Sequence, residues 1–124
     1  VGENSMGLSE GEVLTLEELL YGLVLVSGND AADTLANNYV GGRKNFIKAM
    51  NNKAASLGLS NTNFSNPTGL EGDGDQYSTA FDLLVITKYA MDFSLFREVH
   101  QRLNIISSTQ KIIKHFIFKT KPIF

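Results

Sequence analysis

The strongest constraint on the fold is a helix whose start and stop signals both lie within residues 15–28. Thr15 and Glu18 have the spacing of a capping box, in which each side chain accepts a hydrogen bond from the other residue's backbone N–H. The apolar residues that follow recur at helical spacing and share one face: Leu16, Leu19, Leu20 and Leu23. Val24, Leu25 and Val26 extend the apolar surface around the helix, which predicts a central, buried position. Gly28 then breaks the helix.

Three further helices are expected downstream. Asn29 or Asp30 suits the N-cap of the second, which ends at Gly41-Gly42. A third runs from about Arg43 to Leu57, followed by Gly58 as a C′ residue. Residues 59–77 have no helical or strand period and are rich in turn formers, which predicts a long and therefore functional loop.

The last third of the chain mixes two patterns. Ser78 or Thr79 caps a fourth helix, whose apolar residues are Phe81, Leu84, Val85, Ile86 and Met91. Residues 103–106 and 112–118 are rich in β-branched and aromatic side chains and predict short strands. Residues 5–13 are turn-rich and are expected to form a small hairpin. The fold class predicted is mainly α with a small β portion.

Composition excludes several classes of function. A chain of 124 residues predicts one domain, and a net charge of −2 with scattered basic residues argues against nucleic-acid binding. The absence of cysteine excludes disulfides and thiolate chemistry. The apolar run before Ser27 is too short to cross a membrane, and Val1 does not open a signal peptide. The missing initiator methionine suggests a processed or excised piece.

Ser27-Gly28-Asn29 is the candidate site, because it places a hydroxyl and a carboxamide at a rigid helix junction. A hydroxyl both donates and accepts, which suits proton relay. Taken alone, this tripeptide is equally well explained by two helix-capping residues. Its surroundings decide between the two interpretations.

Several blocks of the sequence resemble the penicillin-binding serine D-alanyl-D-alanine carboxypeptidases, in that family's order and spacing across residues 5–96. They are residues 19–23 leading into 27–32, residues 46–51, 54–58 and 62–70, and residues 77–83. The resemblance implies the helical subdomain of the penicillin-binding/β-lactamase-like α/β fold over residues 1–96. Residues 97–124 would then be a partial return segment toward the sheet, with no second complete domain.

The resemblance also implies an active site of three motifs, S-x-x-K, S-x-N and K-T-G, in that chain order. Ser27 would relay a proton to the leaving D-alanine nitrogen, and Asn29 would bind the substrate carbonyl. The family implies no metal or organic cofactor. Its partners would be peptidoglycan stem peptides and β-lactams, outside the cytoplasmic membrane, with any membrane attachment made by parts of the parent that this chain lacks.

The sequence departs from the family at both outer motifs. No S-x-x-K precedes Ser27, and the one at Ser108-Thr109-Gln110-Lys111 is on the wrong side, so Ser108 is not expected to be the nucleophile. Lys119-Thr120-Lys121 resembles K-T-G but carries a bulky cation in place of glycine. We therefore expect a fragment or truncated homologue that is inactive alone, with apolar surface exposed and open to self-association.

Three alternatives remain. Glu71, Asp73 and Asp75 resemble an acidic metal loop but lack the ligand spacing of a calcium site, so a solvated turn is expected. His100 and His115 could serve Ser27 as bases, yet nothing like G-x-S-x-G surrounds Ser27, which favours structural histidines. The competing function is a non-catalytic helical module that binds peptidoglycan or a protein partner.

Overall fold

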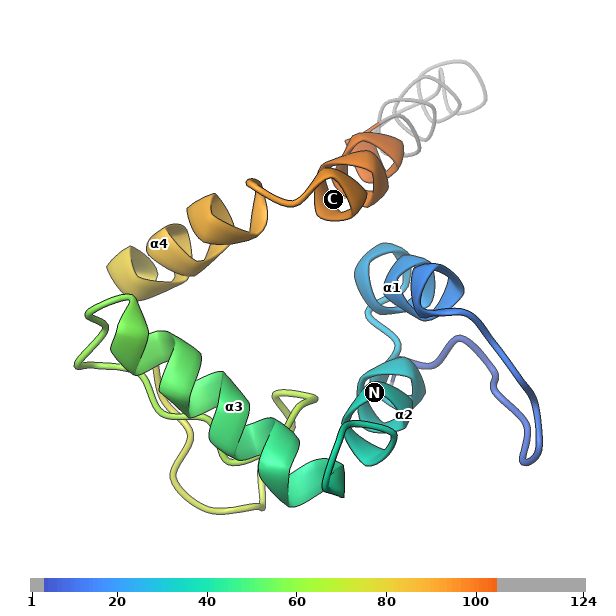
Figure 1. Ribbon diagram of the computed structural model, residues 1–124, viewed down its shortest axis with the longest axis horizontal. Coiled ribbons are helices and arrows are strands. Elements are labelled where there is room, and N and C mark those ends of the chain that lie inside the picture. Colours follow the sequence, from blue (N-terminus) through green and yellow to red (C-terminus); the bar gives the residue numbers. More distant parts are fainter. Residues whose placement is uncertain (1–3, 105–124) are drawn as a thin grey trace, which may run out of the picture.

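The computed structural model describes residues 4–104, which are mainly helical, as predicted (Figure 1). The helices are α1 (Leu16–Leu25), α2 (Asn29–Asn37), α3 (Gly42–Ser56), α4 (Ala80–Ala90) and a fifth at residues 94–104. Within this part of the chain, β structure is limited to one isolated antiparallel bridge between Asn63 and Tyr77. No helix among the described residues is long and apolar enough to span a membrane.

Helix α1 begins with the expected capping box but is not buried all round. Thr15 Oγ1 accepts from Glu18 N at 3.2 Å, and Thr15 N donates to Glu18 Oε2 at 2.7 Å. Leu19 and Gly22 are buried, whereas Leu16 is 59% exposed and Val26 is 48% exposed. The expected central position of α1 is therefore wrong for Leu16 and Val26, which stay open to solvent although α2 packs against the helix.

Glycines mark the start of α2 and both ends of α3, whereas α2 ends at Asn37, before the Gly41-Gly42 expected to end it. The N-cap of α2 is Gly28, without a side-chain hydrogen bond, and not Asn29 or Asp30 as expected. The predicted C′ role of Gly58 is confirmed: its N–H donates to Ala55 O, and Leu59 N donates to Ala54 O, both at 3.0 Å. These two bonds form a Schellman motif, which buries Leu59 against the helix end.

The loop of residues 59–77 is ordered by side-chain amides. Asn66 is 1% exposed; its Oδ1 accepts from Gly69 N at 2.7 Å and its Nδ2 donates to Leu70 O at 2.7 Å. Asn51 in α3 holds the loop through two bonds of 2.8 Å, one to each backbone polar group of Phe64. Amide groups thus satisfy backbone atoms that no helix or ladder reaches.

Helix α4 is capped by Thr79, which accepts from Asp82 N at 3.1 Å and confirms the predicted start. Asp82 is buried and accepts a 2.6 Å hydrogen bond from Thr62, which joins α4 to the loop. The outer side of α4 is apolar and open to solvent: Phe81 is 70% exposed and Leu84 is 65% exposed. This agrees with the exposed apolar surface predicted for a fragment of a larger protein.

Two predictions about the chain ends need correction. Residues 103–104, expected to start a strand, belong to the helix at 94–104, which good helix formers and the burial of Val99 sustain. The rest of that strand and the one at 112–118 lie outside the described residues. The expected hairpin at 5–13 has a turn, with Glu12 N donating to Ser9 O at 3.2 Å, but no strands.

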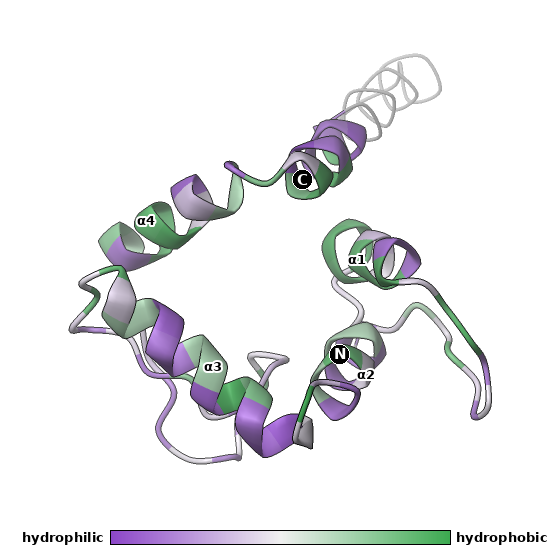
Figure 2. Cartoon of the chain, in the orientation of Figure 1, coloured by the Kyte–Doolittle hydropathy of each residue, from purple (hydrophilic) through white to green (hydrophobic). Residues whose placement is uncertain are grey.

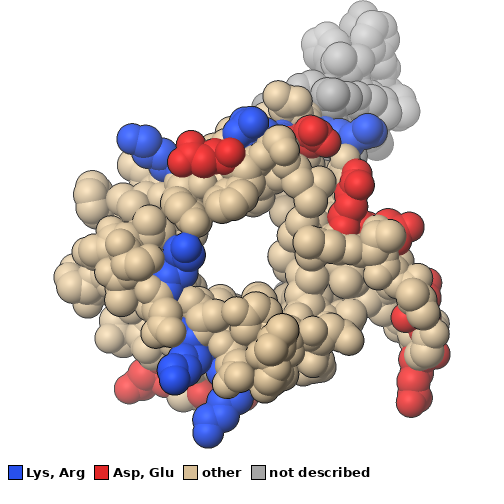
Figure 3. Space-filling model, in the orientation of Figure 1, with Lys and Arg blue, Asp and Glu red and all other residues tan. Residues whose placement is uncertain are grey.

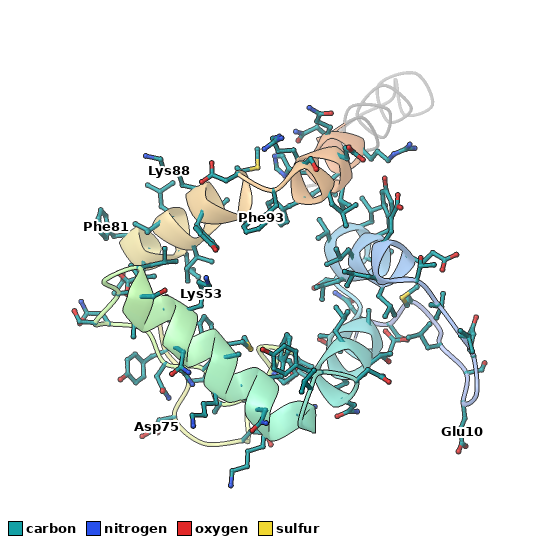
Figure 4. The ribbon with its side chains drawn as sticks, in the orientation of Figure 1. Glu10, Lys53, Asp75, Phe81, Lys88 and Phe93 are labelled. Carbon is teal, nitrogen blue, oxygen red and sulfur yellow. The ribbon has the colours of Figure 1, made fainter. Side chains whose placement is uncertain are left out.

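The helices follow one another around an open ring. Helix α2 packs against both α1 and α3, and an opening passes through the middle of the ring (Figure 3). Apolar residues are prominent along α1 and α4 (Figure 2). Lys53 and Phe93 face the opening whereas Phe81 points away from it (Figure 4), and Lys53 Nζ donates to Tyr89 Oη at 2.9 Å. Side chains of α3 and α4 therefore meet along the inner edge of the ring.

Candidate functional site

Ser27 lies in the tight connection between α1 and α2. Gly22 O accepts from Gly28 N at 3.1 Å and from Val26 N at 3.4 Å, which closes the end of α1. Ser27 has a φ of 57°, the only positive φ at a non-glycine residue in the described part of the chain. Such a conformation costs energy and is retained where the surroundings impose it, as happens at functional sites. It leaves Ser27 exposed to solvent.

Gly28 is required here for space and not for its backbone conformation. Its φ is −65°, which any residue adopts. A Cβ atom at this position would lie 3.0 Å from Asp30 Oδ1, 3.2 Å from Gly22 O and 3.3 Å from Met6 N. The middle position of Ser27-Gly28-Asn29 is therefore closed on three sides by neighbouring polar atoms.

Asn29 is the first residue of α2 and is half-buried. Its N–H donates to Asn4 O at 2.9 Å, which fixes its backbone. Within residues 4–104, neither the Asn29 carboxamide nor the Ser27 hydroxyl makes a side-chain hydrogen bond. The structure therefore brings the two predicted site residues together on one short junction, with hydrogen-bonding capacity to spare.

Asp30 has a role that the sequence did not reveal. Its carboxylate accepts five hydrogen bonds: from Ser5 Oγ at 2.7 Å, and from Met6 N, Gly7 N, Leu8 N and Ala31 N at 3.0 Å each. Burial by itself would raise the pKa of Asp30, but the hydrogen bonds from Leu8, Ser5, Met6 and Ala31 outweigh it and lower the pKa well below its usual range. Four of the five donors lie 22 to 25 residues upstream, so no local pattern signals this role.

Two cavities lie away from this junction. The larger, about 700 Å³, is lined mainly by apolar residues of α1, α2 and the preceding segment, among them Val13, Leu16, Leu20, Leu23 and Leu35. The smaller, about 460 Å³, lies beside the loop and includes Asn66, Thr68 and Gln76. Ser27 and Asn29 line neither of these two cavities.

The other candidate residues do not join the junction. The His100 ring stacks on Phe96 with centroids 6.4 Å apart, a packing role. Arg43, which forms an ion pair with Asp33, also lies 3.8 Å from Asp73 in the acidic loop. In the described part of the chain, no three His, Cys, Asp or Glu side chains could share a metal ion. Ser108, His115 and residues 119–121 lie outside the described residues.

Comparison with known proteins identifies the relatives of this chain. The family model for Peptidase_S11, D-alanyl-D-alanine carboxypeptidase, matches residues 1–121. The D-alanyl-D-alanine carboxypeptidase DacF of Bacillus subtilis is 41% identical over 93 residues, which are 75% of this chain and 24% of DacF. DacB2 of Mycobacterium tuberculosis is 45% identical over 97 residues, which are 77% of this chain and 33% of DacB2. The chain therefore spans a quarter to a third of the length of these relatives.

Solved structures agree. The Streptomyces K15 DD-transpeptidase matches with a TM-score of 0.74 at 44% identity, covering 78% of this chain and 39% of that one. The D-alanyl-D-alanine carboxypeptidase of Mycobacterium tuberculosis also has a TM-score of 0.74 at 44% identity, covering 80% and 38%. The helical ring is thus part of the fold of penicillin-binding enzymes, and the chain belongs to the D-alanyl-D-alanine carboxypeptidase family Peptidase_S11.

Proposed function

We propose that this chain supplies the S-x-N part of a serine-type D-alanyl-D-alanine carboxypeptidase. The observation that carries the proposal is the junction at Ser27 and Asn29, where the hydroxyl and the carboxamide make no side-chain hydrogen bond within residues 4–104 and Ser27 holds a strained backbone conformation. Membership of the D-alanyl-D-alanine carboxypeptidase family supports this role for the junction. This chain matches only a quarter to a third of the length of its relatives, so the carboxypeptidase activity of the complete enzyme is part of the proposal.

The two side chains take different roles in acyl transfer. Ser27 passes a proton to the nitrogen of the departing D-alanine, because an amine leaves only when it is protonated as its bond breaks. The Asn29 carboxamide donates to the carbonyl of the bound peptide and so orients it. The acyl-enzyme serine and its lysine come from polypeptide other than these 124 residues, since the S-x-x-K at Ser108–Lys111 follows Ser27 whereas the family's precedes its S-x-N motif. The opening in the ring and the exposed apolar residues support further polypeptide packing here (Figure 3).

The ligands and location of the enzyme follow from the same proposal. Its substrate is the D-alanyl-D-alanine end of a peptidoglycan stem peptide. The substrate and β-lactams both acylate the serine of the S-x-x-K motif. A cell-wall substrate places the protein outside the cytoplasmic membrane. No cofactor takes part in the steps assigned to Ser27 and Asn29, because both act by hydrogen bonding and proton transfer.

Labelling with a fluorescent penicillin tests this proposal. The 124-residue chain alone should not become covalently labelled, whereas a longer polypeptide carrying the upstream S-x-x-K and downstream K-T-G segments of a relative should. Ser108→Ala is the control for the alternative nucleophile. Labelling of the chain alone that Ser108→Ala abolishes would refute the assignment.

One observation favours a second function. The apolar cavity of about 700 Å³ between α1 and α2 suits an apolar segment of a protein partner. A non-catalytic module would bind such a partner, or peptidoglycan itself, with no need of Ser27. Saturable binding of a stem peptide to the chain, unchanged by Asn29→Ala, would favour this module over the enzyme.

A further inference from the structure

Residues 5–8 form a strap across the start of α2, and one carboxylate fastens it. Asp30 accepts from Ser5 Oγ at 2.7 Å and from Met6 N, Gly7 N and Leu8 N at 3.0 Å each. We infer that Asp30 is a positioning residue: through this strap it holds Ser27 and Asn29 in the geometry that they need. The inference rests on the proposed function, and it assigns to that site a residue that touches no substrate.

The strap and Asn4, which directly precedes it, reach the junction through three further contacts. Met6 packs on Gly22, the residue whose carbonyl closes the end of α1, so closely that no Cβ would fit there. Met6 N also lies 3.3 Å from the position that a Cβ of Gly28 would occupy. Asn4 O accepts from Asn29 N at 2.9 Å, so both ends of the Ser27 turn contact the same segment. Freeing the strap would release the contacts on either side of the strained residue.

Neutral hydrogen-bond donors stabilise the charge of the Asp30 carboxylate. Residues 1–42 contain no lysine or arginine, and acidic side chains line the arm that precedes α1 (Figure 3). The carboxylate instead faces four backbone N–H groups and one hydroxyl, and it lies at the N-terminal end of α2, where the helix dipole favours an anion. Hydrogen bonds to an ionised acceptor are among the strongest in proteins.

An asparagine at this position has the same shape but a poorer set of acceptors. Only one of its two terminal atoms accepts hydrogen bonds, and its NH₂ group would face backbone N–H donors. Asp30→Asn should therefore loosen the strap without removing volume. Asp33→Asn is the matched control, since Asp33 lies one turn along α2 and pairs with Arg43 instead.

Amide hydrogen exchange and NMR shifts of the full chain test the inference. In Asp30→Asn the amides of Met6, Gly7 and Leu8 should exchange at least about tenfold faster, a change of 1.4 kcal/mol. The Cα and Cβ chemical shifts of Ser27 should also move away from the values typical of a residue with positive φ. This change should occur at a temperature where the signals from α3 are unchanged. Asp33→Asn should alter neither. A purely structural role would lower overall stability but leave the Ser27 signature in place.

Other results would overturn the inference. Exchange of the three strap amides within twofold of the wild type, or an unaltered Ser27 signature beside a loosened strap, would exclude a positioning role. If Asp30→Asn does not fold, Ser5→Ala removes only one donor and should still speed exchange at Gly7, whose N–H bonds both Ser5 Oγ and Asp30. No change there would equally refute the inference. These readouts need no enzymatic activity, so they separate failure of the strap from failure of the proposed function.

Discussion

Replacing Ser27 by glycine should stabilise the protein while removing its proposed catalytic group. A non-glycine residue in the left-handed region costs about 1–2 kcal/mol, and Ser27 has a φ of 57°. Glycine relieves that strain but loses about 0.5–1 kcal/mol in backbone entropy on folding. The free energy of unfolding should therefore rise by about 0.5–1 kcal/mol, which raises the Tm by roughly 4 °C in a domain of this size.

The matched variant is Ser27→Ala, which keeps the backbone strain and removes only the hydroxyl. Because that hydroxyl is exposed and has no partner within residues 4–104, the free energy of unfolding should change by less than about 0.5 kcal/mol. Urea denaturation followed by circular dichroism measures both variants on one scale. A glycine variant less stable than the wild type, or an alanine variant destabilised by more than about 1 kcal/mol, would refute the argument that Ser27 stores strain for function.

Three more predictions follow from the same geometry. Gly28→Ala should lower the free energy of unfolding by about 1–3 kcal/mol in urea denaturation, because its Cβ would crowd Asp30 Oδ1 and Gly22 O; an unchanged midpoint would contradict this. Asn66→Ala should cost about 2–4 kcal/mol in the same assay, because it leaves buried polar groups of the loop without partners; a cost below about 0.5 kcal/mol would show that water replaces the amide. Folding lowers the pKa of Asp30, so its contribution to stability is present above the unfolded pKa of about 4 and is lost as the pH falls through the folded pKa. Asp30→Asn should therefore make the free energy of unfolding depend less steeply on pH in acid. An equal slope of that free energy against pH in both proteins would contradict this.

Much of the helical framework could be predicted because its signals are local. The capping box at Thr15 and Glu18 lies within one turn, and the Schellman motif at Gly58 needs only the chemistry of one residue and its neighbours. Packing was harder to foresee. The leucines of α1 suggest a core helix, but their burial depends on which elements cover them, and α2 leaves Leu16 exposed.

The candidate site divides in the same way. Ser27 and Asn29 could be found from a short motif and its flanking blocks, because the chain carries them adjacently. The positive φ of Ser27 is visible only in the structure, and two of the three atoms that crowd a side chain at Gly28, Gly22 O and Met6 N, are brought close by the fold. The strap on Asp30 likewise joins residues more than twenty positions apart.

Steady-state hydrolysis of a D-alanyl-D-alanine peptide tests the central claim most directly, in the longer polypeptide that carries the upstream and downstream motifs. Ser27→Ala should lower kcat by roughly 10²–10⁴-fold, the usual loss when a proton-transfer group is removed, with KM nearly unchanged. Asn29→Ala should raise KM as well, because Asn29 contacts the bound peptide in both ground and transition states. A Ser27→Ala protein with the kcat of the wild type would contradict the account.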